Sequence, residues 1–527
     1  MNSIQCNVDS DLCNSLPSYL ATTQQSQRDI AFNVSIAQSQ YLGIDLTTTV
    51  FQTYGYTTLA LEYVNDLLDL GYQALYAEVY WNEQTSKWQL CPSVLPSSAQ
   101  SGATYNVTRQ TNNETVLCQT NVTLSSLYSS ITEYISTSDT DVSAQIILVN
   151  LGLSMVDNSS LGSGSESFSF GTANLTGPPM VDFTSRIYTP ASLAADRQAG
   201  DLSFLGSTST TASSGYPSAR EFLLYSKKRV VANAFYRNID PNSISYDFSQ
   251  DSSYFFLAGQ DSFTPFTTTF DTMNMSSCTW DQIVQADQET WRAVSETNDD
   301  QFTNSSMQAY ANCGFGPVVN RTITNVTDLL SPLLNSYWSW APGQPFVSNS
   351  SKTSGNSGPI AFQCALLYED GWRVSNCYDS HAVLCRQNGS EFGWIAGQGS
   401  FSYFEAANAC PNNTYFAAPN TALENSVSKQ VVQNTTTTEF PVWIDLNEIS
   451  ITGCWVTGGP YATCPYDSLE SNRNGVALIS IAAAVAALLL GVMFLLTLDS
   501  IPLRRNQGRW RRLIAKYSES QYEGVPS

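Results

Sequence analysis

The chain is poor in the residues that most often carry acid–base chemistry and nucleic-acid binding. Its 527 residues include one histidine, His381, and 23 Lys and Arg against 45 Asp and Glu, which gives a formal net charge of −22. A single imidazole excludes catalysis by a histidine pair and metal centres with several histidine ligands. The acidic excess excludes general binding to nucleic-acid phosphates, because a negatively charged surface repels them.

Charged residues of either sign are absent from one long apolar run, residues 475–498, which predicts a transmembrane helix. At the rise of an α-helix the run is long enough to cross the hydrocarbon core of a bilayer. Six basic residues follow it within residues 499–527, whereas the nearest basic residue before it is Arg473. The positive-inside rule places this tail in the cytosol and residues 1–474 on the lumenal or extracellular side, a single-pass type I topology. The alternative is a helix buried in a soluble core.

The basic tail allows two interpretations. Its segment RWRRLIAK (509–516) is compatible with a short amphipathic helix on the inner leaflet, with Trp510 and Leu513 directed into the lipid. The alternative is that these residues are plain stop-transfer charges.

The first twenty residues lack the apolar segment of a signal sequence. A chain exported in this way needs such a signal. We therefore expect residues 1–25 to be an N-terminal segment whose signal peptide lies upstream of Met1. Alternatively, the apolar run near the C-terminus acts alone as a late insertion signal.

Two further patterns stop at the apolar run. Fourteen Asn-x-Ser/Thr sequons precede it and none follows, a density typical of a glycosylated lumenal surface. The sequons begin at Asn33, Asn106, Asn113, Asn121, Asn158, Asn174, Asn274, Asn304, Asn320, Asn325, Asn349, Asn388, Asn412 and Asn434. All twelve cysteines also precede it, which favours a disulfide-forming compartment over the cytosol. Because residues 499–527 hold six basic and three acidic residues, the part before them carries a formal charge of −25.

Alternation of strands and helices over residues 26–335 predicts an α/β domain built of parallel βαβ units. Buried strands are expected at 41–46, 74–80, 146–149 and 229–235. Helical spacing of apolar residues predicts helices over 58–70, 124–135 and 217–225, the first capped by Thr58 and ended by Gly71. These units are fewer than the eight of a closed barrel, so the prediction of a barrel depends partly on a resemblance.

Short motifs in this domain resemble phosphatidylinositol phospholipase C-like barrels. They are SQRD (26–29), YLGID (41–45), Gly71, AEVYW (77–81), GYPS (215–218) and KKRVV (227–231). The resemblance implies a TIM barrel in which two histidines act as general base and general acid, but residues 26–335 contain no histidine. Carboxylates such as Asp45 and Glu78 remain at the strand ends, where they either hold a divalent cation or hydrogen-bond within the barrel mouth. We expect a degenerate barrel without catalytic residues, metal or other cofactor.

Motifs in residues 336–470 resemble a C-type lectin-like module whose two halves occur in reversed order. The closing half is WAPGQP (340–345), Cys364, GW (371–372), Cys377 and VLC (383–385), and the opening half is FSYFEAANAC (401–410), AP (418–419), EN (424–425) and VWIDL (442–446). The resemblance implies the disulfides Cys364–Cys377 and Cys385–Cys410. The Glu-Pro-Asn, Gln-Pro-Asp and Trp-Asn-Asp triplets of calcium-dependent sugar-binding members are absent from the chain. The alternative is an unrelated β module rich in Cys and Trp.

The remaining cysteines are assigned from their spacing. Cys454 and Cys464 flank a short turn and are expected to pair, since zinc would need a CxxC spacing that is absent. For the others we expect sequence neighbours to pair, as Cys6–Cys13, Cys91–Cys118 and Cys278–Cys313. His381, between two cysteines, is either a metal ligand or a surface histidine.

A wider set of motifs covers the chain from about residue 25 to its end. They are SQRD (26–29), WSW (338–340), WRV (372–374), NCY (376–378), WIDLN (443–447), GCWV (453–456), GGPYA (458–462), CPY (464–466) and EGVPS (523–527). Together they resemble a fungal family of single-span membrane glycoproteins named for maintenance of telomere capping, the sixth of its series. The name implies a role in telomere capping and no biochemical activity. Because an acidic lumenal domain does not reach chromosomal DNA, we expect any effect on telomeres to be indirect, for instance through membrane or wall homeostasis.

The sequence thus predicts a chain in five parts: residues 1–25, a lumenal barrel (26–335), a lumenal lectin-like module (336–470), a membrane helix (475–498) and a basic cytoplasmic tail (499–527). We expect a non-catalytic glycoprotein of the secretory pathway that spans the lipid bilayer once. It would bind a lumenal or cell-wall glycan or protein, without direct contact with nucleic acid. Two alternatives remain open: a carboxylate- or metal-dependent hydrolase of lipid headgroups or glycans, and a carbohydrate-binding receptor.

Overall fold

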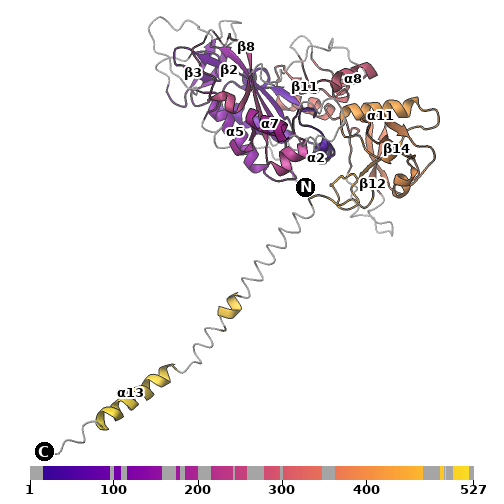
Figure 1. Cartoon of the computed structure of the whole chain (residues 1–527). Coiled ribbons are helices and arrows are strands. Elements are labelled where there is room, and N and C mark those ends of the chain that lie inside the picture. The colour runs from indigo at the N-terminus through magenta and orange to yellow at the C-terminus, as the bar shows by residue number, and fades with distance from the viewer. Residues whose placement is uncertain are drawn as a thin grey trace, which may run out of the picture. The chain divides into compact units, whose positions relative to one another are not determined.

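The computed structural model describes residues 16–94, 100–108, 115–156, 174–177, 184–199, 215–240, 242, 244–257, 278–296, 301–346, 362–466, 487–491, 493 and 503–520. The chain forms two compact units, residues 1–464 and 465–527, and each is described by itself. The first unit contains two large sheets, one from each of the two expected modules (Figure 1).

The first sheet has nine strands, and its centre is parallel. The central strands β1 (Gly43–Asp45), β2 (Ala74–Asn82), β6 (Ile147–Met155) and β8 (Val230–Asn238) lie side by side in that order. Beyond β1 follow β11 (Gly316–Val319) and β10 (Ala293–Ser295), and β8 pairs with both β7 (Ile187–Tyr188) and β9 (Phe255–Leu257). The parallel βαβ pattern is therefore confirmed.

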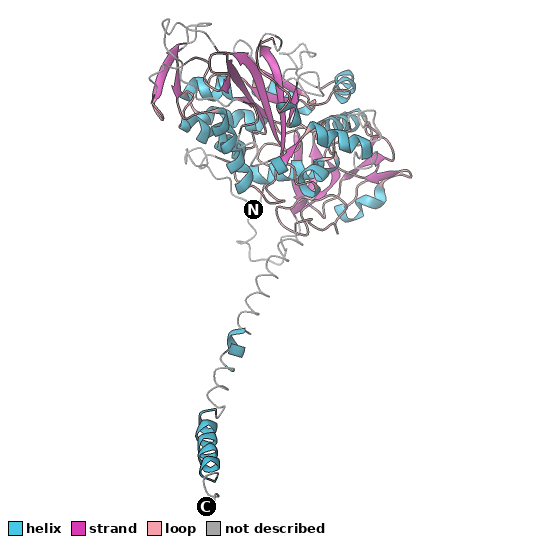
Figure 2. Ribbon diagram, turned by 60° about the vertical axis from the view of Figure 1, so that its left-hand side comes forward, coloured by secondary structure: helices cyan, strands magenta, loops and turns pink. Residues whose placement is uncertain are grey.

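The sheet is an open, partial barrel. Within the described part of the chain, β10 forms one end of the sheet and no pairing joins it to β7 or β9 at the other end. A closed TIM barrel needs eight strands that pair around the whole circle. The closed barrel implied by the phospholipase C resemblance is thus not formed among these residues. Helices gather beside the strands in Figure 2.

Local sequence explains where the two long helices of this sheet begin and end. The helix α4 (Thr58–Leu70) is capped by the Thr57 hydroxyl, which accepts a hydrogen bond from the Ala60 N–H, so the expected cap at Thr58 is displaced by one residue. It ends at Gly71, whose φ of 105° is left-handed and suits a residue without Cβ. The helix α5 (Leu124–Thr137) begins with a capping box at Thr123.

The other elements around the first sheet are short. The helix expected over 217–225 is formed by residues 219–225, of which η6 (Glu221–Tyr225) is π-helical. The longer of them are α2 (Leu20–Ile30), α7 (Pro190–Ala199), α8 (Trp280–Asp287), α9 (Asn304–Asn312) and α10 (Leu330–Asn335). The strands outside the parallel order are β3 (Lys87–Gln89), β4 (Thr104–Thr108) and β5 (Thr115–Gln119). The remaining short helical segments are η1 (Ala31–Asn33), η2 (Thr47–Phe51), α3 (Gln52–Tyr54), η3 (Thr184–Arg186), η7 (Asp251–Ser253) and η8 (Val326–Leu329).

The two faces of the first sheet differ in polarity. Residues in register on neighbouring parallel strands present their side chains on the same face. One row, Ile44, Leu75, Val149 and Ala232, is apolar and belongs to the main hydrophobic core. The adjacent row, Asp45, Tyr76, Asn150 and Asn233, is polar yet buried. This second face is the interior side of the partial barrel.

The second sheet has six strands: β12 (Phe362–Tyr368), β13 (Gly371–Asn376), β14 (Ala382–Gln387), β15 (Trp394–Ala396), β16 (Thr414–Phe416) and β17 (Val442–Asn447). Most neighbours are antiparallel, but β14 and β17 run parallel. The helix α11 (Ala422–Asn434) is capped by Thr421, whose side chain accepts a hydrogen bond from the Glu424 N–H. The 3-10 helix η11 (Tyr403–Ala409) precedes β16. Strands from both halves of the expected module thus form one mixed sheet.

Five disulfides staple this unit. They are Cys91–Cys118, Cys278–Cys313, Cys364–Cys377, Cys385–Cys410 and Cys454–Cys464, with Cα–Cα separations of 5.3 to 6.0 Å. All five pairings agree with the expected ones, and the sixth, Cys6–Cys13, lies outside the described residues. Each closes a short loop of the chain, which restricts the unfolded state.

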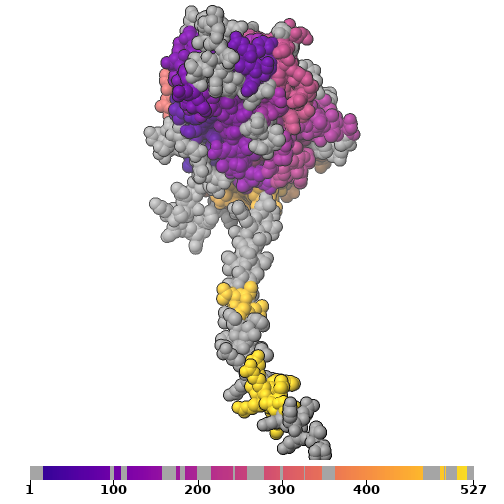
Figure 3. All heavy atoms as spheres, turned by 90° about the vertical axis from the view of Figure 1, so that its left-hand side faces the viewer, coloured from indigo at the N-terminus to yellow at the C-terminus, as the bar shows by residue number. Residues whose placement is uncertain are grey.

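The two expected modules share one hydrophobic core. Trp338 and Trp340, which join them, pack edge-on against Trp372 at ring-centroid distances of 5.5 and 5.9 Å. The indole N–H of Trp340 donates to the Ser26 hydroxyl of α2 at 2.7 Å. The expected boundary at residue 335 is therefore a change of sheet within continuous packing. From the side shown in Figure 3, the segment before about residue 335, coloured indigo to pink, forms most of the coloured surface of this unit. The orange segment after it is visible only at the margin.

The second unit is described only in part. Residues 487–491 and 493 are helical, and a longer helix, α13, spans Leu503–Ser520. Most of the run 475–498, predicted as a transmembrane helix, lies outside the described residues. Among the residues that are described, none of the helices is both long and apolar enough to cross a membrane.

Candidate functional site

The two candidate carboxylates meet at the carboxyl ends of the central strands, as their positions predict. Asp45 ends β1, and its Oδ1 accepts hydrogen bonds from the N–H groups of Thr47 and Thr48 at 2.9 and 3.2 Å. Glu78 lies on β2 and accepts from the Tyr80 hydroxyl at 2.5 Å. Both acids are thus engaged by the chain around them.

A cation from a third strand joins the two acids. Arg237 on β8 places Nη1 2.8 Å from Glu78 Oε1 and 3.8 Å from Asp45 Oδ2. The guanidinium contacts both carboxylates and so takes the place that a divalent cation bound by them would need. In the part of the chain that the structure describes, no group of three or more His, Cys, Asp or Glu side chains is arranged to hold a metal ion.

Burial sets the electrostatics of this site. The Asp45 side chain is 3% exposed, and its loss of hydration raises its pKa to about 6, although Arg237 acts to lower it. The pKa of the neighbouring Tyr76 is also raised, first by burial and then by the negative charge of Asp45. Near neutral pH, Asp45 therefore stands close to its point of titration.

Behind these acids the interior row continues with groups that lack partners. Asn150 is fully buried and neither its amide nitrogen nor its oxygen has a hydrogen bond among the described residues. The hydroxyl of Ser154, further along β6, also has none within the described structure. Since buried polar groups are nearly always paired, this face has hydrogen-bonding capacity that the described protein atoms leave unused.

Sequence reasoning missed Arg237, Asn150 and Asn233. A signal for the two asparagines was present, because each follows a run of buried strand residues, IILV (146–149) and VVA (230–232). The parallel register then brings them side by side. Arg237 had no comparable signal, since its role depends on how the end of β8 approaches β2.

A cavity lies at the opposite, amino ends of the strands. It has a volume of about 920 Å³ and is lined by α2, the loops that precede the strands, and residues 336–338. Four half-buried glutamines line it, and no hydrogen bond of their side-chain amides is found in the described structure. These are Gln25, Gln38, Gln73 and Gln145.

The charges around this cavity are largely satisfied or weakened. Arg292 donates to four backbone carbonyls, those of Gly314, Ala286, Glu289 and Gln38. Asp69 has a pKa raised to about 7, first by burial and then by the nearby Asp66. The cavity therefore presents neutral amides and aromatic residues such as Tyr41 and Tyr337 more than free charge.

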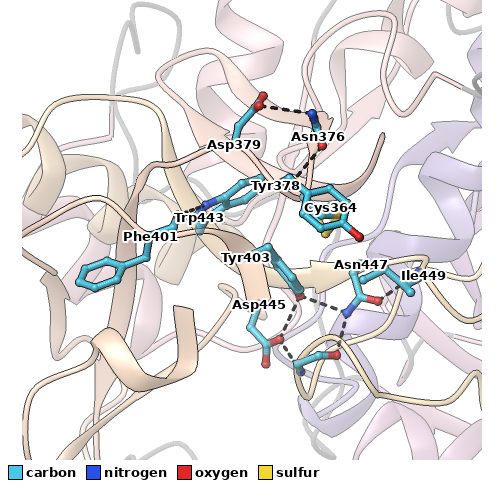
Figure 4. Close-up of a disulfide and its surroundings, with 12 residues drawn as sticks. Cys364, Asn376, Tyr378, Asp379, Phe401, Tyr403, Trp443, Asp445, Asn447 and Ile449 are labelled. Atoms are coloured by element: carbon cyan, nitrogen blue, oxygen red, sulfur yellow. Dashed lines mark hydrogen bonds between the residues drawn. A yellow bond between two sulfur atoms is a disulfide. The ribbon is translucent and has the colours of Figure 1, made fainter. Parts of the chain in front are cut away.

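The motif VWIDL (442–446) around Trp443 has a structural role. Asp445 accepts from the N–H groups of Gly458 and Gly459, both at 2.8 Å, and from the Tyr403 hydroxyl at 3.3 Å (Figure 4). Asn447 donates to Tyr403 and to the Gly459 carbonyl. Together they hold the 458–459 turn against β17. Burial raises the pKa of Asp445 despite these donors.

His381 behaves as a half-buried structural residue. Its backbone forms a bridge with Phe401, and its ring lies 5.3 Å from that of Trp443 in an edge-on arrangement. Burial lowers its pKa, although Asp379 acts in the opposite direction. These contacts explain the position of His381, and no bound metal is needed to account for it.

Most of the described sequons are open to the solvent. Eight of their asparagines are exposed, namely Asn33, Asn106, Asn121, Asn304, Asn325, Asn388, Asn412 and Asn434. Asn174 and Asn320 are half-buried. The sequons at Asn113, Asn158, Asn274 and Asn349 lie outside the described residues.

Comparisons with known proteins agree on one family. The family model described as the MTC6 partial TIM-barrel domain matches residues 14–340. A Yarrowia lipolytica protein named Maintenance of telomere capping protein 6 is 30% identical, with 96% of this chain and 91% of that protein covered. Proteins of the same name from Meyerozyma guilliermondii and Debaryomyces hansenii are each 29% identical, with 98% and 95% of this chain and 96% and 94% of the relatives covered. No solved structure matches.

Proposed function

Because the chain belongs to the maintenance of telomere capping protein 6 family, whose name states a role and no chemistry, we propose its function from its own residues. The proposal is a non-catalytic, membrane-anchored glycoprotein of the secretory pathway or cell surface that binds a neutral, polar partner. The observation that carries it is the ion pair of Arg237 with Glu78 and Asp45, which occupies the mouth of the partial barrel.

The acidic groups at the mouth of the partial barrel are held by hydrogen bonds and ion pairs, an arrangement that favours stability over catalytic turnover. A general acid or base must be free to reach the reacting atom. Glu78 is held by Arg237 and Tyr80, and Asp45 is buried beneath two backbone N–H groups. The residue types that phospholipase C-like enzymes use for proton transfer are missing from this domain, since the only histidine of the chain, His381, lies directly before β14.

The anchoring and the compartment are supported by independent features. The uncharged run 475–498 and the basic tail after it favour one span with the tail in the cytosol. Exposure of the described sequons and the five disulfides favour a lumenal location for the rest. Removal of N-glycans from cell extracts should lower the apparent mass by several glycans, and an unchanged mass would contradict the topology.

The cavity at the amino ends of the strands is the best candidate for the binding site. Its free glutamine amides each offer a donor and an acceptor, and its aromatic residues offer apolar faces. Neutral polyhydroxylated molecules such as oligosaccharides match that combination. Its volume of about 920 Å³ is at the upper end of ordinary ligand pockets.

A glycan array tests this binding site. The purified chain, with its own N-glycans trimmed, should bind neutral glycans, and Gln38→Ala with Gln145→Ala should abolish the signal. Gln84→Ala, an exposed glutamine outside the cavity, should leave it unchanged. Binding that is insensitive to the cavity variants, or an absence of binding, would reject the site.

A role in telomere capping, taken from the name of the relatives, would be indirect. A formal charge of −25 on the part before residue 499 opposes contact with DNA. Membrane or wall homeostasis is the route we propose. Recovery of the intact, glycosylated protein on chromatin would contradict this.

The hydrolase alternative is favoured by one observation, the raised pKa of Asp45 at about 6, which is suited to proton transfer near neutral pH. The purified chain should be assayed for hydrolysis of phosphatidylinositol and neutral glycans with Mg²⁺, Ca²⁺ or Mn²⁺. The non-catalytic proposal expects no turnover above that of a Glu78→Gln variant. Turnover that this substitution removes would establish the enzyme instead.

A further inference from the structure

We propose that α13 binds flat on an anionic lipid surface through one apolar stripe. The helix spans Leu503–Ser520 in the second unit. On the proposed topology, this surface would be the cytoplasmic leaflet of the membrane. That topology is needed here only because it brings the helix near a bilayer. The structure extends the short segment 509–516 considered from the sequence to a helix of 18 residues.

The stripe follows from helical spacing. Trp510, Leu513, Ile514 and Tyr517 stand at positions i, i+3, i+4 and i+7, which share one face of an α-helix. All four are exposed, at 64%, 46%, 64% and 74%. Such large apolar side chains are usually covered in a folded protein, so this face is suited to a partner that removes it from water.

The charges on the rest of the helix identify the partner. Arg509, Arg511, Arg512 and Lys516 are exposed and occupy the other faces, and no acidic residue lies between positions 507 and 518. A helix with an apolar stripe flanked by cations lies in the headgroup region, where the stripe enters the acyl boundary and the cations meet anionic lipids. Trp and Tyr side chains also favour that interface.

This combination favours a lipid surface over a protein groove. A groove would need complementary acidic and apolar side chains, whereas a bilayer with anionic headgroups supplies both properties at every position. The four cations near such a surface together correspond to roughly a thousandfold in binding. Binding should therefore depend strongly on anionic lipid.

Amide hydrogen exchange on the full chain tests the inference. The chain is mixed with vesicles of phosphatidylcholine alone, or with about one-third phosphatidylserine, a composition that strengthens the surface potential. Residues 507–518 should exchange at least roughly tenfold more slowly with the anionic vesicles, because a 1.4 kcal/mol gain already gives that factor. Equal exchange in the two lipids would overturn the proposal.

Matched variants separate the stripe from the charges. Leu513→Gln with Ile514→Gln, and separately Arg511→Gln with Arg512→Gln, should each return the exchange to that seen with neutral vesicles. Ala515→Gln adds the same side chain on the polar face and should keep the protection. Protection that survives the first pair would refute the apolar stripe.

The same experiment distinguishes this inference from the proposed anchoring. Residues 475–498 should be protected in both vesicle compositions if they span the bilayer. If residues 475–498 are not protected, the proposed anchor is rejected. The binding of α13 is still tested in that case, because it is judged only by whether the protection of residues 507–518 depends on anionic lipid.

Discussion

The buried carboxyl of Asp45 predicts a pH dependence of stability with a definite sign. Its pKa is raised by burial to about 6 in the folded protein, whereas an unfolded aspartate titrates at about 3.9. Between these values the folded state binds more protons than the unfolded state, so the stabilising contribution is present at low pH. It is lost as the pH rises through the folded pKa.

The magnitude follows from the size of the shift. A difference of about two pKa units corresponds to about 3 kcal/mol, which is an upper bound for one group. Asp45→Asn removes the titration, while the Asn oxygen can still accept the N–H groups of Thr47 and Thr48. The variant should therefore gain stability relative to the natural protein by up to about 3 kcal/mol between pH 4 and pH 7.

Urea unfolding at a series of pH values measures this difference. Only the change with pH is compared, so any constant effect of the substitution cancels. Asp247→Asn is the control, because Asp247 is exposed and hydrogen bonds from Ser249 lower its pKa. Its contribution to stability therefore changes mainly below pH 4, with the opposite sign, and little between pH 4 and 7. A stability difference between Asp45→Asn and the natural protein that stays constant from pH 4 to 7 would refute the reasoning.

Three further substitutions test the packing of the first unit by thermal and urea unfolding. Gly71→Ala should lower the free energy of unfolding by about 1–3 kcal/mol. An L residue is strained at a φ of 105°, and the added Cβ would lie 2.4 Å from the side-chain nitrogen of Gln24. Removal of one disulfide by Cys364→Ala with Cys377→Ala should lower the free energy of unfolding by about 2–4 kcal/mol. Trp340→Phe should lose about 1–3 kcal/mol, because it leaves the buried Ser26 hydroxyl without its indole donor.

Their controls are matched in chemistry and differ in environment. Gly102→Ala also has a positive φ, of 79°, but no atom lies within 4 Å of the added Cβ, so it should cost less than Gly71→Ala. Trp280→Phe changes a half-exposed indole and should change stability little. When the disulfides are reduced, the natural protein and the variant without the cysteine pair should no longer differ in their free energy of unfolding. Equal losses for a variant and its control would contradict the assigned contact.

The strands and helices of the α/β part could be predicted because their patterns are local. The expected strand over 74–80 is β2, and the helix from 124 to 135 is α5. The cap of α4 was misplaced by one residue, since Thr57 and Thr58 are chemically equivalent and only the backbone angles distinguish them. The helix expected over 217–225 is likewise formed, by residues 219–225.

The long-range features could not be predicted in the same way. The ion pair of Arg237 with Glu78 joins residues 159 positions apart, and no local pattern encodes that approach. The open ends of the first sheet and the tryptophan packing across residue 335 depend on the tertiary fold in the same manner. The disulfide partners were more accessible, because all five described pairs join cysteines that are sequence neighbours.

The contact between the first helix and the junction of the two sheets has a consequence for biosynthesis. The Thr23 hydroxyl donates to the carbonyl of Gln344, and Trp340 donates to Ser26, so α2 is completed by residues more than three hundred positions later. During synthesis at several residues per second, the first helix must therefore wait tens of seconds for its partners to emerge. The nascent chain exposes an unfinished core throughout that interval, which makes its early segment a substrate for folding factors until translation nears its end.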